Sequence, residues 1–259
     1  MIENEKFDIF IAYYGNKDTG SEKCAHDIYD FLKNKEIFHG RNVRAYFHPE
    51  TNPYGRFEDT PLIVARTPLF LMVVDKKIKR TVDGQLARQR DDGSLSNIYE
   101  EVRTFHDSPM YRSPGGDSAS KLYITDDFSF KEAERLHPIF SGRTALNTKT
   151  EVLEWITFFY KNTYVSRLYS YYKYLANNKK EEFIKGDWVS EAEEIWNYTL
   201  DEGLARTLMI YYIMKSDDGD EESTRRLRFF YDRLISSPRL ERSTQNILGK
   251  IKVKFFNFT

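Results

Sequence analysis

The stretch LFLMVVD, residues 69–75, is the most apolar short run of the chain and decides the fold. Six apolar residues before an aspartate have the length and composition of a strand buried on both faces, as central strands of parallel sheets are. FDIFIAY, residues 7–13, has the same almost continuous apolar character. Two weaker runs complete the set of predicted strands, VRAYFHP at 43–49 and SKLYITD at 120–126.

Segments with a helical spacing of apolar residues alternate with these strands. They are SEKCAHDIYDFLKNKE at 21–36, FEDTPLIVART at 57–67 and SNIYEEVRTF at 96–105. The charged, glycine-containing residues 76–95 predict a long surface loop. Strands that alternate with helices are joined by right-handed crossovers, so we expect an α/β domain with a doubly wound parallel sheet.

The pattern changes after about residue 150, where helical periodicity with many aromatic residues replaces almost all strand patterns. The alternating stretch IKVKFFNF, residues 251–258, is the exception and predicts an edge strand. We therefore expect two parts, an α/β domain at residues 1–160 and a mainly helical extension at residues 161–259.

Composition excludes several classes of protein. The 39 Lys and Arg residues nearly cancel the 40 Asp and Glu residues, so no net field favours nucleic acid or a membrane surface. No apolar run approaches membrane-spanning length, and the first residues lack the pattern of a signal peptide. The single cysteine, Cys24, excludes a disulfide within the chain and favours a reducing, cytoplasmic location. The five histidines have no ligand spacing, so no metal site is predicted.

The order of these elements resembles that of the TIR domain family, named for Toll and interleukin-1 receptors. The first strand is similar to the family's D-x-F-I-S-Y opening, with Ala12 in place of the serine. Residues 55–59, GRFED, resemble the start of the family's BB loop and following helix. Residues 97–102, NIYEEV, are similar to the pattern of a tryptophan, three residues, a glutamate and an aliphatic residue. The resemblance covers roughly residues 6–160 and implies a flavodoxin-like doubly wound sheet.

The resemblance also implies an activity. Many members of the family cleave the bond between nicotinamide and ribose in NAD, and some cyclise the remaining ADP-ribose into a signalling nucleotide. NAD would then be the substrate, and no cofactor would be needed. The sequence of the first loop, YGNKDTGSE, resembles bacterial rather than animal members, and bacterial members often act in defence against phage. The family further implies a homo-oligomer assembled through the TIR-like domain, and a partner protein of the defence system or a receptor for the signal nucleotide.

This chemistry needs little machinery, because the nicotinamide ring is already cationic and leaves as a neutral base. The species to be stabilised is the oxocarbenium-like ribose. A carboxylate beneath that ring supplies negative charge where positive charge develops.

Helical geometry distinguishes the two adjacent glutamates of SNIYEEVRTF. At about 100° per residue, the apolar residues fall on one buried stripe. The stripe consists of Leu95, Ile98, Val102 and Phe105. Glu100 points away from its centre, whereas Glu101 lies about 80° to its side, where a carboxylate is partly desolvated and still reaches a cleft. This geometry and the family's register both select Glu101 as the predicted catalytic residue.

The predicted substrate cleft lies outside the carboxyl ends of the strands, where parallel sheets bind ligands. The predicted substrate-binding residues leave the strands at that edge, follow the BB-loop segment or occupy the family's tryptophan position. They are Tyr13, Tyr14, Gly15, Phe47, His48, Phe57 and Asn97. Asn97 departs from the family pattern, because asparagine cannot stack on a nicotinamide ring as tryptophan does.

Two alternatives to an NAD-cleaving enzyme stay open at the level of sequence. One is a non-catalytic TIR module that works by assembly through its BB loop, and both Asn97 and Ala12 favour it. The other is a nucleoside-processing enzyme such as a deoxyribosyltransferase, which also uses a glutamate against a ribosyl carbon. The second alternative leaves the helical extension unexplained.

Overall fold

The chain forms two compact units, Met1–Tyr164 and Val165–Thr259, so the boundary follows residue 164 rather than the expected 160. The computed structural model describes residues 6–14, 20–38, 40–51, 60–89, 93, 96–112, 116–125, 128–140, 145–217, 219–237 and 240–255. Among these residues, no helix combines the length and the hydropathy needed to cross a lipid bilayer.

A four-stranded, all-parallel sheet forms the centre of the first unit. Its strands are β1 (Ile9–Tyr13), β4 (Ala45–Tyr46), β5 (Leu69–Val74) and β6 (Ser120–Ile124), in the order β4-β1-β5-β6. The two central strands pair along their length, with Ile9 opposite Leu69 and Tyr13 opposite Val73. Every residue of β5 is buried, so the prediction of a central parallel strand is confirmed.

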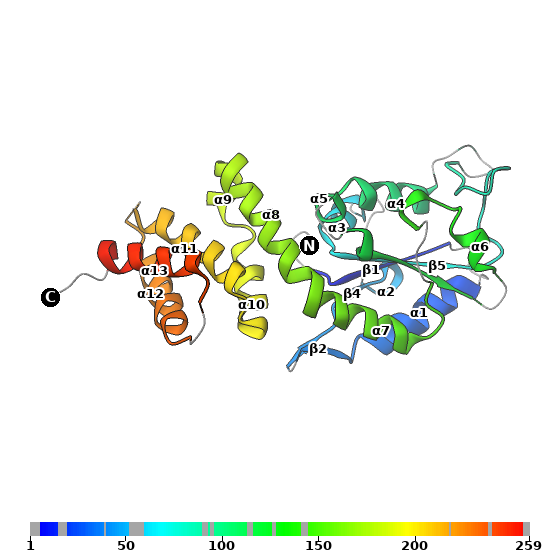
Figure 1. The fold of residues 1–259 in the computed structure, drawn as a ribbon. Helices are drawn as coiled ribbons and strands as arrows, with labels where there is room; N and C mark the ends of the chain where they lie inside the picture. The colour runs from blue at the N-terminus through cyan, green and yellow to red at the C-terminus, as the bar shows by residue number, and fades with distance from the viewer. Residues whose placement is uncertain are drawn as a thin grey trace. The chain divides into compact units, whose positions relative to one another are not determined.

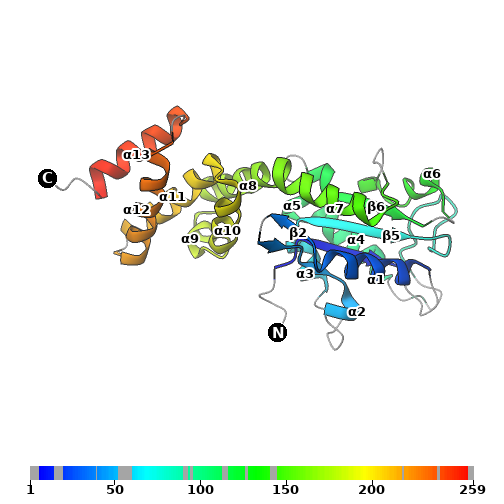
Figure 2. The ribbon, with the colours of Figure 1, turned by 90° about the horizontal axis from the view of Figure 1, so that it is seen from below.

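Helices cover both faces of this sheet. Figure 1 shows α3 (Thr60–Arg66), α4 (Asn97–Asp107) and α5 (Pro109–Arg112) on one face. On the other face, α1 (Gly20–Leu32) contacts α7 (Lys149–Phe158), as Figure 2 also shows. Shorter elements complete the unit: α2 (His48–Thr51), η2 (Gly116–Ala119), α6 (Phe130–Ala133), η3 (Pro138–Phe140) and the π-helical segment η4 (Phe159–Tyr164).

Two of the predicted elements are shorter than expected. The first helix ends at Leu32 rather than residue 36, and the chain then forms an antiparallel hairpin of β2 (Glu36–Phe38) and β3 (Arg41–Asn42). The strand predicted at 43–49 pairs only at Ala45–Tyr46. A helical turn begins at His48, because the following Pro49 lacks the N–H that a further ladder bond requires.

Asp8 anchors the amino end of β1. Its buried carboxylate accepts hydrogen bonds from Arg41 Nη2 at 2.6 Å, the Arg44 backbone N–H at 2.7 Å and the Tyr160 hydroxyl at 2.7 Å. A charge is tolerated in the core here because several donors converge on it. The network ties the hairpin and the end of the first unit to the sheet, at the edge opposite the carboxyl ends of the strands.

The second unit is helical, as expected. Its helices are α8 (Val165–Asn178), α9 (Lys180–Lys185), α10 (Val189–Thr199), α11 (Glu202–Asp217), α12 (Glu221–Ile235) and α13 (Arg242–Phe255). α11 contacts each of the others. Aromatic pairs fill the space between them: the rings of Tyr172 and Trp188 stack at 4.3 Å, and those of Trp196 and Phe230 lie 4.6 Å apart.

The edge strand predicted at 251–258 is wrong for its described part, because residues up to Phe255 belong to α13. The buried residues of this helix are Thr244, Leu248 and Ile251, which are spaced by four and three positions and fall on one helical face. Two of these lie before the alternating stretch. The alternation of lysine with apolar residues in IKVK was therefore a local coincidence inside a longer helical period.

Candidate functional site

The strand order reverses between β1 and β5, because the chain moves from β1 to β4 on one side and then to β5 on the other. In open α/β sheets, ligands bind in the crevice outside the carboxyl ends of the strands at such a reversal. Tyr13 ends β1 at this edge, and Asp75 directly follows β5. The side chains around these two residues therefore form the candidate site.

Aromatic side chains line the β1 and β4 side of this edge. The ring of Tyr13 lies 5.3 Å from that of Phe47, which follows β4. Phe47 also contacts Tyr29 at 5.7 Å and His26 at 5.9 Å, both on α1. Phe47 is only 1% exposed and is a packing residue, whereas Tyr13 is half-buried. Tyr13 therefore brings a polar hydroxyl to the end of β1, where Phe47 packs against its ring.

Glu101 and Glu100 occupy different environments on α4. Glu100 pairs with Arg103 at 2.6 Å on the surface. Glu101 is half-buried, and loss of hydration raises the pKa of its carboxyl from 4.5 to about 8. No side chain in the described part of the chain gives Glu101 a hydrogen bond or an ion pair. A desolvated carboxylate without a compensating partner is energetically costly, and such groups are concentrated at functional sites.

Acidic residues on both helices that flank this edge affect the Tyr13 hydroxyl. Burial, and after it the negative charges of Glu22 on α1 and Glu101 on α4, raises the pKa of the Tyr13 hydroxyl to about 12. The two carboxylates therefore act on the same hydroxyl from opposite faces of the sheet. At neutral pH the hydroxyl keeps its proton and is a hydrogen-bond donor.

Asp75 and Ser21 are site-forming residues that the sequence did not single out. Asp75 is 2% exposed, and its carboxylate accepts hydrogen bonds from the Ser21 N–H at 3.0 Å and the Lys77 N–H at 2.9 Å. The Ser21 hydroxyl donates to the Tyr14 carbonyl at 2.8 Å. Together these bonds fix the first turn of α1 against the ends of both central strands. The available signal was an acidic residue directly after the most apolar strand.

The other predicted site residues fall at different places. Asn97 is half-buried and begins α4, one turn before Glu101 on the same face. His48 is half-buried at the start of α2, and burial lowers its pKa. Gly15 and Phe57 lie outside the described residues. The structure thus brings Tyr13, Phe47 and Glu101 to one edge of the sheet, with Asn97 beside Glu101 along the helix.

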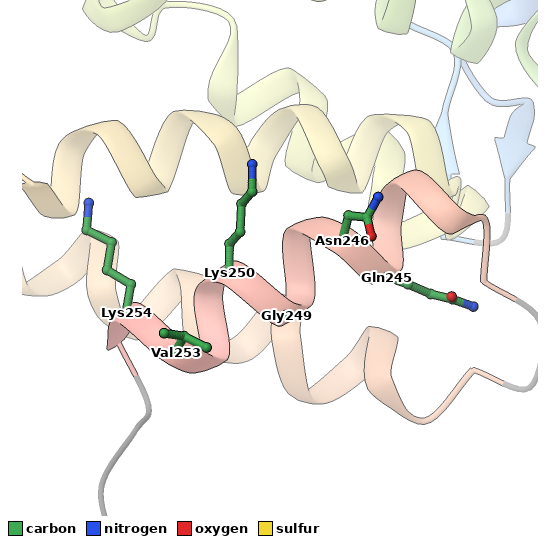
Figure 3. A pocket seen from close by; sticks show the side chains of 6 residues that line it. All are labelled: Gln245, Asn246, Gly249, Lys250, Val253 and Lys254. Carbon is green, nitrogen blue, oxygen red and sulfur yellow. The ribbon is translucent and has the colours of Figure 1, made fainter.

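A surface hollow in the second unit is lined by no carboxylate and no aromatic residue. It is lined by residues of α13 alone: Gln245, Asn246, Gly249, Lys250, Val253 and Lys254. Figure 3 shows Lys250 and Lys254 extending in the same direction from the helix, and Lys254 forms an ion pair with Asp217 of α11. The lining offers two cations and two amides, with no nucleophile or acid. Within the described residues, no three His, Cys, Asp or Glu side chains converge as metal ligands.

Comparison of the chain with protein-family models, with curated proteins and with solved structures found no match.

Proposed function

We propose that this chain is a TIR-like enzyme that cleaves the bond between nicotinamide and ribose in NAD, with Glu101 as its catalytic carboxylate. One observation carries the proposal: an unpaired, desolvated glutamate faces the carboxyl end of the sheet at the reversal of strand order. This is the place where open α/β sheets bind nucleotides. In the flavodoxin-like arrangement, the strand that follows the first one along the chain lies at the edge of the sheet, outside the first strand. The order β4-β1-β5-β6 agrees with this, because β4 is the next strand of this sheet after β1 and lies at its edge.

The reaction breaks the bond between the ribose C1′ and the pyridine nitrogen. The electron pair of that bond goes to the ring nitrogen and neutralises its charge, so nicotinamide leaves without a general acid. The ribose carbon becomes oxocarbenium-like, and Glu101 stabilises it as a carboxylate. Water adds to C1′ and gives ADP-ribose and a proton, or a nitrogen of the adenine adds instead and closes a cyclic product.

The raised pKa of Glu101 fits a cationic substrate. In the free protein a carboxyl with a pKa of about 8 is mostly protonated at neutral pH, which avoids a bare charge in a poorly hydrated place. A positively charged nicotinamide riboside beside it favours the ionised form, so substrate binding releases a proton and creates the carboxylate. The Tyr13 hydroxyl, which remains a donor, is placed to bond a ribose or carboxamide oxygen.

The test is to incubate the purified chain with NAD, with and without a crowding agent, and to resolve the products by mass. We expect nicotinamide together with linear or cyclic ADP-ribose. Since TIR enzymes generally complete their site with a second subunit, we expect the rate to rise more steeply than linearly with protein concentration. Release of nicotinamide by Glu100→Gln but not by Glu101→Gln supports the proposal.

Other outcomes favour the alternatives. If no nicotinamide is released even when the protein is assembled, the non-catalytic assembly module is favoured. If a deoxyribonucleoside is cleaved in preference to NAD, with transfer of the sugar to a second base, the deoxyribosyltransferase alternative is favoured. Equal NAD cleavage by wild type and Glu101→Gln places the catalytic group elsewhere. A role in defence against phage, with a partner protein or a receptor for the product, is the biological setting that the family resemblance favours.

A further inference from the structure

We propose that Glu22 is a further specificity-determining residue of this site, which together with Glu101 selects the cationic, phosphate-free riboside end of the substrate. The proposal rests on the proposed function for the identity of the substrate. In this arrangement the nicotinamide riboside end of a dinucleotide enters the crevice between the ends of β1 and β5.

The start of α1 already holds an anion supplied by the protein. In nucleotide-binding α/β folds, free backbone N–H groups at the helix start beside this crevice commonly bind a phosphate. Here the buried carboxylate of Asp75 already accepts the Ser21 N–H at 3.0 Å, so the protein supplies its own anion. A phosphate approaching this helix end would meet a negative charge in place of an open donor. The start of α1 is therefore closed to the diphosphate of a dinucleotide.

Two further acids, Glu22 and Glu101, lie on the helices beside the crevice. Glu22 follows Ser21 in the same turn of α1, and this turn is fixed to both central strands through Asp75 and the Tyr14 carbonyl. Glu22 and Glu101 lie on helices that cover opposite faces of the sheet, and the negative charge of each raises the pKa of the Tyr13 hydroxyl at the end of β1. Glu22 is half-buried and has no ion pair among the described residues. Two carboxylates thus act at this edge of the sheet, and the charges that shift the pKa of Tyr13 are those of these two acids.

The chemical consequence is selection by charge. The oxidised nicotinamide ring is a cation, and its reduced form is neutral and of nearly the same size. Two carboxylates that flank the ring favour the oxidised form, and the diphosphate and adenosine must leave the crevice away from α1. Glu101 stabilises the reacting ribose, whereas Glu22 favours binding of the cationic ring over the neutral one.

The experiment measures binding without turnover. The probes are carbocyclic nicotinamide riboside, in which a methylene replaces the ring oxygen so that no oxocarbenium forms, and its neutral reduced form. Titration calorimetry of the full chain is expected to show roughly tenfold tighter binding of the cation. In Glu22→Gln this preference is expected to fall to about twofold, with unchanged affinity for the neutral form. Asp27→Asn is the matched control, because Asp27 is an exposed acid of the same helix that faces a different direction.

Several results overturn this proposal. They are equal binding of the two probes by wild type, the same preference in Glu22→Gln as in wild type, an equal loss in Asp27→Asn, or binding of neither probe. Competitive displacement of the cation by inorganic phosphate contradicts the closed start of α1. The proposed function fails separately: a protein that discriminates between the probes but releases no nicotinamide from NAD retains the charge selection without the cleavage activity. Circular dichroism of each variant confirms that the helices are intact.

Discussion

Replacing Glu101 by glutamine should stabilise the protein at high pH and have little effect at low pH. The folded-state pKa of Glu101 is about 8, against an ordinary value of 4.5. Between these two values the unfolded chain has lost the proton that the folded chain still holds. The free energy of unfolding of wild type therefore falls as the pH rises through this window, because the folded state binds more protons. Glutamine at the same position carries no charge and shows no such loss.

The size of the effect follows from the same pKa. Each pKa unit corresponds to about 1.4 kcal/mol, so a rise from 4.5 to about 8 costs the ionised protein at most about 5 kcal/mol. A half-buried carboxylate keeps part of its hydration, which brings the expected advantage of Glu101→Gln to about 3 kcal/mol at high pH. At about pH 5 the two proteins should differ by less than about 1 kcal/mol.

Urea unfolding at a series of pH values between about 5 and 9 measures this directly, with the free energy extrapolated to zero denaturant. Glu100→Gln is the control, since it removes only an exposed ion pair with Arg103 that is worth about 0–1 kcal/mol. An advantage of Glu101→Gln that does not grow with pH would mean that Glu101 is hydrated or paired in the folded protein and that its pKa is not raised.

The kcat/KM for NAD should rise with pH and level off above about 8, because the free protein must lose the Glu101 proton; a pH–rate profile measures this. Tyr160→Phe removes a hydrogen bond to the buried Asp8 carboxylate and should cost about 1.5–3 kcal/mol in urea unfolding. Gly186→Ala should lower the thermal midpoint, because the residue has a φ of +79° and an added Cβ would lie 2.4 Å from the Tyr211 hydroxyl oxygen. Thr148→Ala removes the N-cap of α7 and should cost about 1 kcal/mol, measured by the same urea titration.

Much of the fold could be predicted because buried strands and amphipathic helices leave periodic patterns in sequence. β1 and β5 are nearly continuous apolar runs, and the stripe on α4 placed Ile98, Val102 and Phe105 in the core, as the structure confirms. The same helical geometry predicted that Glu101 lies at the border of the core and Glu100 in solvent, since the direction of a side chain on a helix follows from its position in the sequence.

The parts that sequence missed depend on contacts between distant segments or on a longer period than the one considered. The bond between Asp75 and Ser21 joins residues that are 54 positions apart, so no local pattern reveals it. The hairpin of β2 and β3 consists of strands of three and two residues, too short for a visible alternation. In α13 a short alternation concealed a helical face that begins before it.

The most direct test of the central claim is the kcat/KM for nicotinamide release from NAD, measured side by side for wild type, Glu100→Gln and Glu101→Gln at one protein concentration. Glutamine has the shape of glutamate but cannot offer a full negative charge to the forming oxocarbenium. We expect kcat/KM to fall about a hundredfold or more in Glu101→Gln and to stay near that of wild type in Glu100→Gln. Equal rates in Glu101→Gln and wild type would mean that Glu101 is not the catalytic carboxylate.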